Sequence, residues 1–154
     1  MNHEYIGKLQ KGCAFIPCYL KGTGKATRIY FLDGGFEYTG YSVSKVINDY
    51  CALNMRSMQS IKRFCQNITG RKCITPLYIK KNTLFMPVKS LKPFRRGDKC
   101  IGYINVNYIE SVDFDKNAIK LNNGDSIEYL DTIETIKKRM GDCVMIKQAA
   151  GNID

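Results

Sequence analysis

Apolar residues in the first forty positions come in short runs separated by glycine-containing turns. The runs are 14–20, 27–32 and 36–38. Short apolar runs bounded by such turns are typical of strands joined in hairpins. We therefore predict a β meander over about residues 1–40.

The spacing of apolar residues changes to three and four from Tyr41 onward, which predicts amphipathic helices. A first stripe, capped by Ser42 or Ser44, predicts a helix over residues 44–53, and a second stripe predicts a helix over residues 57–68. The stripes are Val43, Val46, Ile47, Tyr50 and Cys51, and then Met58, Ile61, Phe64, Cys65 and Ile68. Gly70 stands where a C-cap glycine belongs. The pair could form a helix-turn-helix, although Met55-Arg56 lacks the small residue usual in that turn.

The second half of the chain returns to short apolar runs and ends in a helical pattern. The predicted strands are 77–79, 83–88, 100–106, 109–114, 118–121 and 126–129. Residues 89–99 read as a loop, and Asn123-Gly124 belongs to a hairpin turn. Residues 132–140 predict a closing helix, followed by a weakly structured tail over 141–154. The expectation is one strand-rich α+β domain spanning 1–154, with antiparallel hairpins or meanders and two to three short helices.

The positive charge of the chain is concentrated in one segment. The net charge is +10, and residues 56–99 hold twelve of the 24 Lys and Arg residues but a single acid, Asp98. Crowded cations repel one another unless a polyanion relieves the repulsion, and nucleic acid is a common partner of that kind. An acidic protein or a membrane surface would also relieve it.

The basic residues fall into three clusters, on the second helix, just after it, and in the loop. The residues that we expect to contact DNA are Arg56, Lys62, Arg63, Arg71, Lys72, Lys89, Lys92, Arg95, Arg96 and Lys99. A loop rich in Arg and Lys can follow phosphates or enter the minor groove of A·T-rich DNA. If the three clusters act together, they should face one side of the domain.

Other chemistry has little support in the sequence. The seven cysteines form no CxxC pair and only His3 could add a nitrogen ligand, so we expect reduced thiols and neither a metal nor another cofactor. One histidine also leaves little material for acid–base catalysis, and the acids near Asp113 and Asp125 fit a solvated surface, so we expect no enzyme. No apolar run is long enough to span a membrane, and the polar start is unlike a secretory signal. These features favour a cytoplasmic protein.

Several short motifs, in order, resemble the competence transcription factor (ComK) family of low-GC Gram-positive bacteria. The matching segments are Ser44, Val46 and Ile47 leading to Cys51, Ser57 with Lys62-Arg63, TPLYI at 75–79, LFMPVKS at 84–90, CIGYI at 100–104 and LNNG at 121–124. They are similar to that family's cysteine-containing helix with its serine pair and GRK motif, and to its K-x-P-I, LFP-T-x-S, C-x-W-I and F-x-N-G motifs. Ile61 replaces the glycine of GRK, and Tyr103 stands where tryptophan is usual.

The resemblance implies a DNA-binding transcription activator of competence genes. Members of the family recognise A·T-rich promoter boxes, largely through the minor groove, as homodimers or higher oligomers on DNA. An adaptor protein for proteolysis is a further partner implied by the family, through a tail that this chain shows in shortened form.

Two rival interpretations remain open. The first is an interaction module whose basic surface docks an acidic protein or RNA without specific DNA binding. The second is a DNA binder of the LytTR type without activator function, because residues 104–109 before the NG hairpin resemble the end of such β domains.

Overall fold

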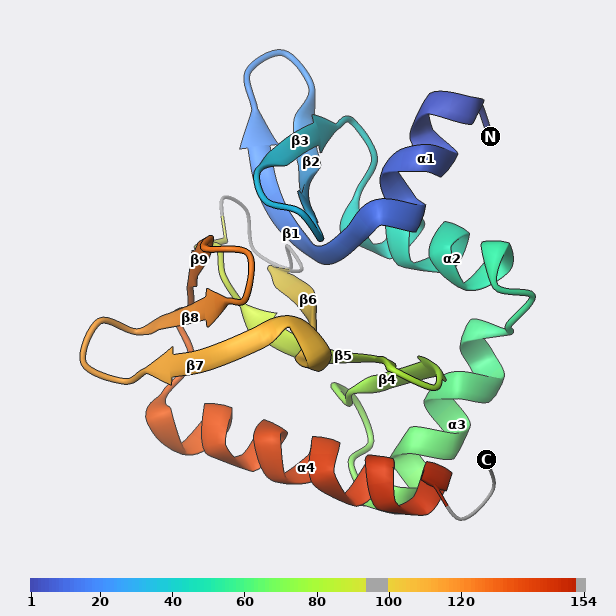
Figure 1. The fold of residues 1–154 in the computed structure, drawn as a ribbon, viewed down its shortest axis with the longest axis vertical. Helices are drawn as coiled ribbons and strands as arrows, with labels where there is room; N and C mark the ends of the chain where they lie inside the picture. Colours follow the sequence, from blue (N-terminus) through green and yellow to red (C-terminus); the bar gives the residue numbers. More distant parts are fainter. Residues whose placement is uncertain (94–99, 152–154) are drawn as a thin grey trace.

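The computed structural model describes residues 1–93 and 100–151, which form an α+β domain of antiparallel sheets and helices (Figure 1). Within these residues it has four α-helices and nine strands. In chain order they are α1 (His3–Lys11), β1 (Gly12–Leu20), β2 (Gly24–Phe31), β3 (Phe36–Thr39), α2 (Val43–Leu53), α3 (Met58–Thr69), β4 (Leu77–Lys80), β5 (Thr83–Lys89), β6 (Ile101–Asn105), β7 (Ile109–Asp113), β8 (Ala118–Leu121), β9 (Ser126–Glu128) and α4 (Ile133–Gly151), with a 3-10 turn at Val106–Tyr108.

A six-stranded sheet joins the two halves of the chain. Its order is β3-β2-β1-β6-β5-β4, and every neighbouring pair is antiparallel. The halves meet where β1 pairs with β6, in the register Ala14↔Ile104 and Phe15↔Tyr103. This pairing stops before Pro17, which has no N–H to donate to a further ladder bond. A short junction therefore holds the N-terminal and C-terminal strands in one sheet.

Gly102 of β6 permits the close approach of β1 at this junction. A Cβ at this position would lie 2.9 Å from the backbone oxygen of Phe15 and 2.9 Å from side-chain carbons of Ile16 and Pro17. Real side chains do not tolerate contacts this short, so only glycine lets β1 and β6 come together without a shift of the backbone.

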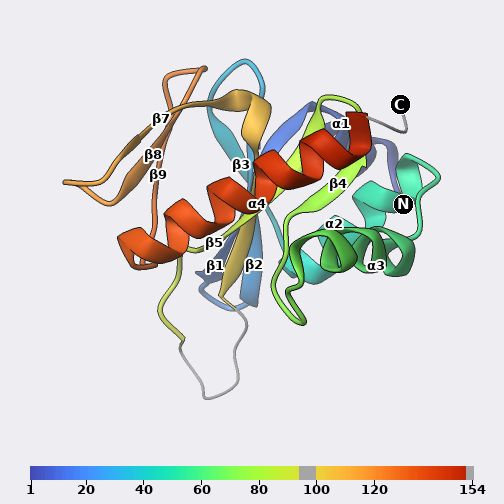
Figure 2. The ribbon, with the colours of Figure 1, turned by 90° about the horizontal axis from the view of Figure 1, so that it is seen from below.

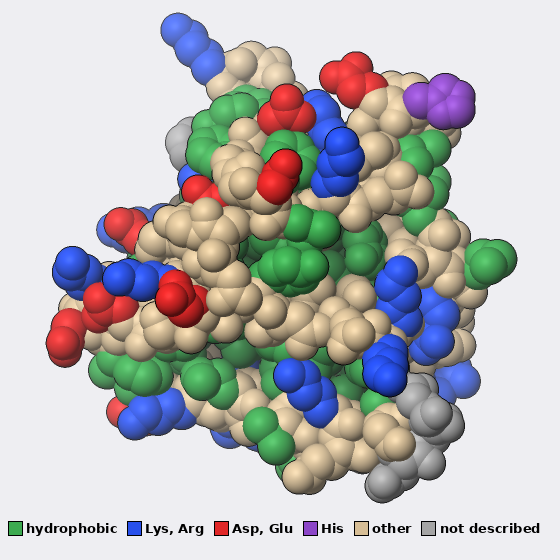
Figure 3. Space-filling view, viewed as in Figure 1, with side chains coloured by type: hydrophobic (Ala, Val, Ile, Leu, Met, Phe, Trp, Pro, Cys, Tyr) green, Lys and Arg blue, Asp and Glu red, His purple; other side chains and the backbone are tan. Residues whose placement is uncertain are grey.

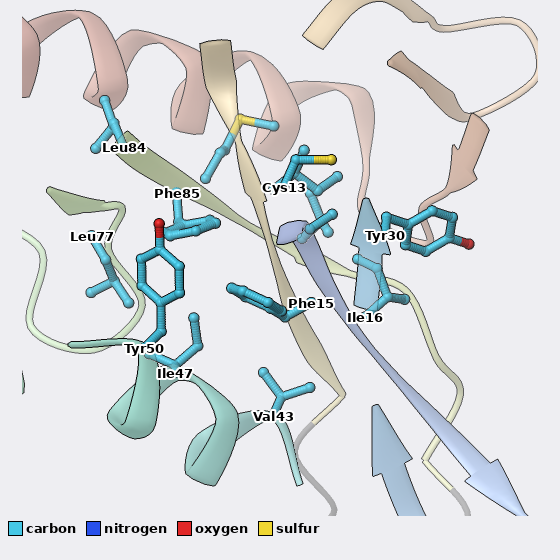
Figure 4. Close-up of a cluster of buried hydrophobic side chains, with 14 of the residues drawn as sticks. Cys13, Phe15, Ile16, Tyr30, Val43, Ile47, Tyr50, Leu77, Leu84 and Phe85 are labelled. Atoms are coloured by element: carbon cyan, nitrogen blue, oxygen red, sulfur yellow. The ribbon is translucent and has the colours of Figure 1, made fainter. Parts of the chain in front are cut away.

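The two faces of the large sheet are covered by different elements. Phe15 and Phe85 point to the face that carries α2, where their rings and that of Tyr50 lie 5.3–5.5 Å apart between centroids (Figure 4). The sheet of β7, β8 and β9 lies on the other side of the large sheet from α2 (Figure 2), and α4 runs below the sheets in the view of Figure 1. The small sheet is fastened to the β2–β3 turn, because Asn123 Nδ2 donates to the Phe31 oxygen at 2.6 Å and Gly35 N donates to Asp125 at 2.9 Å.

The structure confirms the α+β class and both central helices, which begin and end within a residue of the expected positions. The prediction of β structure was wrong for the first residues, since His3–Lys11 form α1. Only Tyr5 and Leu9 of this helix are buried, so its apolar pattern is too short to recognise. The Tyr5 hydroxyl donates to Asp49 of α2 at 2.8 Å, a tertiary contact that supports the helix.

The prediction of a weakly structured tail was also wrong, because α4 continues to Gly151. Gly141-Asp142 resembles the end of a helix in the sequence. In the fold, Asp142 is 3% exposed and pairs with Arg71, while Ile146 and Ala150 pack inward, so tertiary contacts carry the helix past this point.

Two glycine substitutions test the junction between β1 and β6. We expect Gly102→Ala to lower the free energy of unfolding by about 2 kcal/mol or more, because the new methyl group meets the β1 backbone. Gly141→Ala is the matched control. It adds a methyl group on the exposed side of α4 with nothing within 4 Å, and should raise the free energy of unfolding by about 0.5–1 kcal/mol. Urea denaturation of both variants measures the difference, and equal stability of the two would contradict the close-approach argument.

Candidate nucleic-acid interface

Helix α3 presents a polar, acid-free face to solvent. Ser57 caps it by accepting a hydrogen bond from Ser60 N at 3.3 Å, and Ile61 and Cys65 anchor it in the core. Its exposed side chains are Gln59, Ser60, Lys62, Arg63 and Asn67. These are cations, amides and a hydroxyl, the groups that donate hydrogen bonds to phosphates and base edges.

The turn before α3 is made without a small residue. Met55 adopts the left-handed conformation with φ 55°, and its side chain is 93% exposed. Arg56 N donates to the Cys51 oxygen at 2.9 Å and closes the turn, while the side chain of Arg56 is exposed. Arg56 therefore lies at the N-terminal end of the polar face of α3.

The chain after α3 is tied back to the helix. Gly70 ends α3 in the left-handed conformation with φ 73°, as the sequence predicts for a C-cap. Gln66 Nε2 then donates to the Lys72 oxygen at 3.1 Å, and Arg71 N donates to Thr69 Oγ1 at 3.2 Å. These bonds hold the exposed side chain of Lys72 next to α3.

Arg71 has a structural partner. Its Nε and Nη2 atoms donate to the two carboxylate oxygens of Asp142 at 3.1 and 3.3 Å. The Asp142 side chain is 4% exposed and that of Arg71 is 35% exposed. The guanidinium neutralises a buried carboxylate on α4, so Arg71 is committed to the packing of α3 against α4.

The loop cluster begins at the end of β5. Lys89 N donates to Asp131 at 2.7 Å, and Leu130 N donates to the Lys89 oxygen at 2.7 Å. Asp131 also accepts from Arg139 at 2.9 Å. This network fixes the backbone at Lys89, whose side chain is exposed like that of Lys92. Arg95, Arg96 and Lys99, which we also expect to contact DNA, lie outside the described residues.

A cavity of about 570 Å³ brings residues of the first and third clusters together. Lys62 of α3, Cys73 of the following segment and Lys89 of β5 line it, together with the start of α2 and of β6. The sequence gives no signal for this cavity, because its wall is assembled from segments far apart in the chain. Of the three clusters, the helix and the loop thus each place one lysine at the same cavity.

Charge is unevenly distributed over the surface. Residues 56–92 hold nine Lys and Arg residues and no acid. Among the described residues, Arg71 is the member of this group that forms an ion pair. In the view of Figure 3, basic side chains stand beside α3 without acids, whereas acidic and basic side chains are mixed over β7–β9 and the hairpins above.

Several acids have structural roles that account for their positions. Asp113 accepts two backbone N–H bonds at 3.1 Å in the β7–β8 turn, and Asp125 and Asp131 bond as described above. The described residues contain no group of three or more His, Cys, Asp or Glu side chains placed to hold a metal ion. None of their helices is both long and apolar enough to cross a membrane.

No protein-family model, curated protein or solved structure gives a significant match to this chain.

Because Arg71 pairs with Asp142 and Lys72 is exposed, loss of these two neighbouring charges should have different effects on stability. Arg71→Gln should lower the free energy of unfolding by about 2–3 kcal/mol, because it leaves a buried carboxylate without its partner. Lys72→Gln removes an exposed charge and should change it by less than about 0.5 kcal/mol. Urea denaturation distinguishes the two. The double variant Arg71→Gln/Asp142→Asn should recover part of the loss, and a double variant as unstable as the additive sum would contradict the pairing.

Proposed function

We propose that this protein binds duplex DNA through the polar face of α3, the segment that follows it and the end of β5. The observation that carries the proposal is the run of nine cations without an acid over residues 56–92, of which only Arg71 has an ion-pair partner in the described part of the chain. Unpaired surface cations on one side of a fold are the electrostatic footprint of a nucleic-acid binder.

Charge repulsion and the geometry of the fold both favour DNA binding at this surface. Lys62 and Lys89 line one cavity although 26 positions separate them, so the fold places like charges close together. DNA phosphates relieve that repulsion and release condensed counterions, which favours binding. The amides of Gln59 and Asn67 and the hydroxyl of Ser60 lie beside these cations on α3 and add neutral donors and acceptors.

The resemblance to competence transcription factors gives the proposal its biological form. It supports a transcription regulator that prefers A·T-rich promoter boxes and acts as a homodimer or higher oligomer. The charge distribution supports only the binding of a polyanion, so the two parts of the proposal need separate tests.

Removing three positive charges from the proposed interface, and in a control from a distant surface, tests the location of the interface. The triple variant Lys62→Gln/Arg63→Gln/Lys72→Gln should weaken binding to an A·T-rich duplex by about tenfold or more at about 0.1 M salt. It should also reduce the slope of log K against log salt by up to about three, since each neutralised phosphate contributes about 0.9. Fluorescence anisotropy over a salt series measures both quantities.

The matched control has the same net charge as this variant. Lys21, Lys116 and Lys120 are exposed and lie on the β1–β2 turn and the β7–β8 hairpin. Their triple change to Gln should leave the affinity within about threefold of wild type, because distant charges are screened over about 10 Å. Equal weakening by the two triple variants would overturn the assignment of the interface.

Base composition tests the part that comes from the resemblance. We expect an A·T-rich duplex to bind more tightly than a G·C-rich duplex of equal length in the same anisotropy assay, because its narrow minor groove has a more negative potential. Equal affinities would contradict the expected preference for A·T-rich DNA but not the proposed DNA interface. Competition with single-stranded RNA and with an acidic protein tests the rival interaction module. Displacement of the DNA at lower concentration by either competitor would favour the rival.

A further inference from the structure

The cavity beside Lys62 has a wall of mixed chemistry. Its lining residues are Val43, Ser44, Lys62, Cys73, Ile74, Thr75, Leu77, Lys89, Pro93, Cys100, Ile101 and Tyr103. The segment that follows α3 and the end of β5 both contribute to this wall. The cavity lies where these two segments meet the start of α2.

The polar part of this wall suits an anion. Lys62 and Lys89 form no ion pair with any described residue, and none of the described residues lining the cavity is acidic. Val43 and Ser44 begin α2, so their N–H groups have no partner within the helix and the helix dipole favours negative charge here.

A buried hydroxyl in the same wall lacks a partner. Thr75 is 2% exposed, and its Oγ1 atom forms no hydrogen bond. Burying a hydroxyl in this way is unfavourable by about 1–3 kcal/mol. This atom has less than 1 Å² of accessible surface, so a ligand oxygen would accept the missing bond only after a small movement of the wall.

The rest of the wall suits an apolar group. Its remaining lining residues include Ile74, Leu77, Pro93, Ile101 and Tyr103. The volume of about 570 Å³ lies in the range of small-molecule sites, which are mostly apolar with a few polar groups that orient the ligand. A free phosphate ion would leave most of this space unfilled.

We propose that this cavity binds a small phosphate monoester with a flat apolar body. The phosphate lies between Lys62 and Lys89 at the start of α2, and the apolar body packs against Ile101 and Tyr103. The inference rests on the proposed function in one respect: Lys62 also belongs to the DNA interface. A bound phosphate monoester neutralises that charge and weakens DNA binding, so the cavity couples a small anion to the affinity for DNA.

Cys73 gives a direct readout of occupancy. It lines the cavity and is the exposed member of the seven cysteines. Burial raises the pKa of Cys51 to about 11 and the pKa of Cys13 and of Cys143 to about 12, which keeps these thiols protonated and slow to react at neutral pH. The rate at which iodoacetamide alkylates Cys73, followed by mass spectrometry, therefore reports on the cavity.

The probe is phenyl phosphate, with inorganic phosphate and phenol as its two halves. Phenyl phosphate should slow alkylation of Cys73 by about tenfold at ten times its dissociation constant. Each half alone should bind at least about tenfold more weakly, because it lacks one of the two sets of contacts, and should therefore slow alkylation by no more than about twofold at the same concentration. Absence of protection by phenyl phosphate, or equal protection by inorganic phosphate, would overturn the proposed site.

Variants tie the protection to the two lysines. The double variant Lys62→Gln/Lys89→Gln should bind phenyl phosphate about tenfold or more weakly. The ratio of the Cys73 alkylation rates with and without the ligand measures this affinity. The control variant Lys21→Gln/Lys116→Gln has the same net charge. In this variant phenyl phosphate should protect Cys73 as well as it does in the wild-type protein. Equal loss in both double variants would place the anion elsewhere.

DNA anisotropy separates this inference from the proposed function. Phenyl phosphate that protects Cys73 should also lower the affinity for the duplex. Protection without a change in that affinity would overturn the coupling. If the protein binds DNA but phenyl phosphate does not protect Cys73, only the proposed cavity site is rejected. If phenyl phosphate protects Cys73 but the protein binds no duplex, the DNA function is rejected and the cavity site is retained.

Discussion

The pairing of β1 with β6 is the contact on which the rest of the architecture depends. It joins strands from the two halves of the chain through Ala14 and Phe15, and Gly102 makes the approach possible. Once the sheet is continuous, Phe15 and Phe85 meet Tyr50 and fix α2 on one face. The same continuity places the end of β5 next to the start of α2, so the cavity and the interface both follow from this junction.

Residues 56–92 carry nine cations and no acid, and the fold places two of them, Lys62 and Lys89, at one cavity. Arg71 is an exception in this segment, because Asp142 holds its guanidinium group in a structural position. The remaining cations of residues 56–92 have no such partner in the described part of the chain. Under the proposed function an external anion would complete their electrostatics, and a duplex and a small phosphate monoester would share Lys62.

Local patterns were sufficient to predict the elements that carry their own signals. The caps Ser57 and Gly70 and the stripe through Ile61 and Cys65 define α3 from the sequence alone. The first helix and the second half of α4 depend on distant partners, Asp49 and Arg71, and no local pattern reveals these. The same limit applies to the site: the sequence identifies the basic residues, but not that Arg71 is committed to Asp142 or that a cavity lies between Lys62 and Lys89.

Lysine footprinting on the bound duplex tests the central claim most directly. The protein is acylated with and without an A·T-rich duplex, and each lysine is quantified by mass spectrometry. The account predicts protection of Lys62, Lys72, Lys89 and Lys92, all of them exposed in the free protein, and unchanged reactivity at the equally exposed Lys21, Lys116 and Lys120. Protection confined to the second group, or spread evenly over both, would contradict a DNA interface built on α3 and the end of β5.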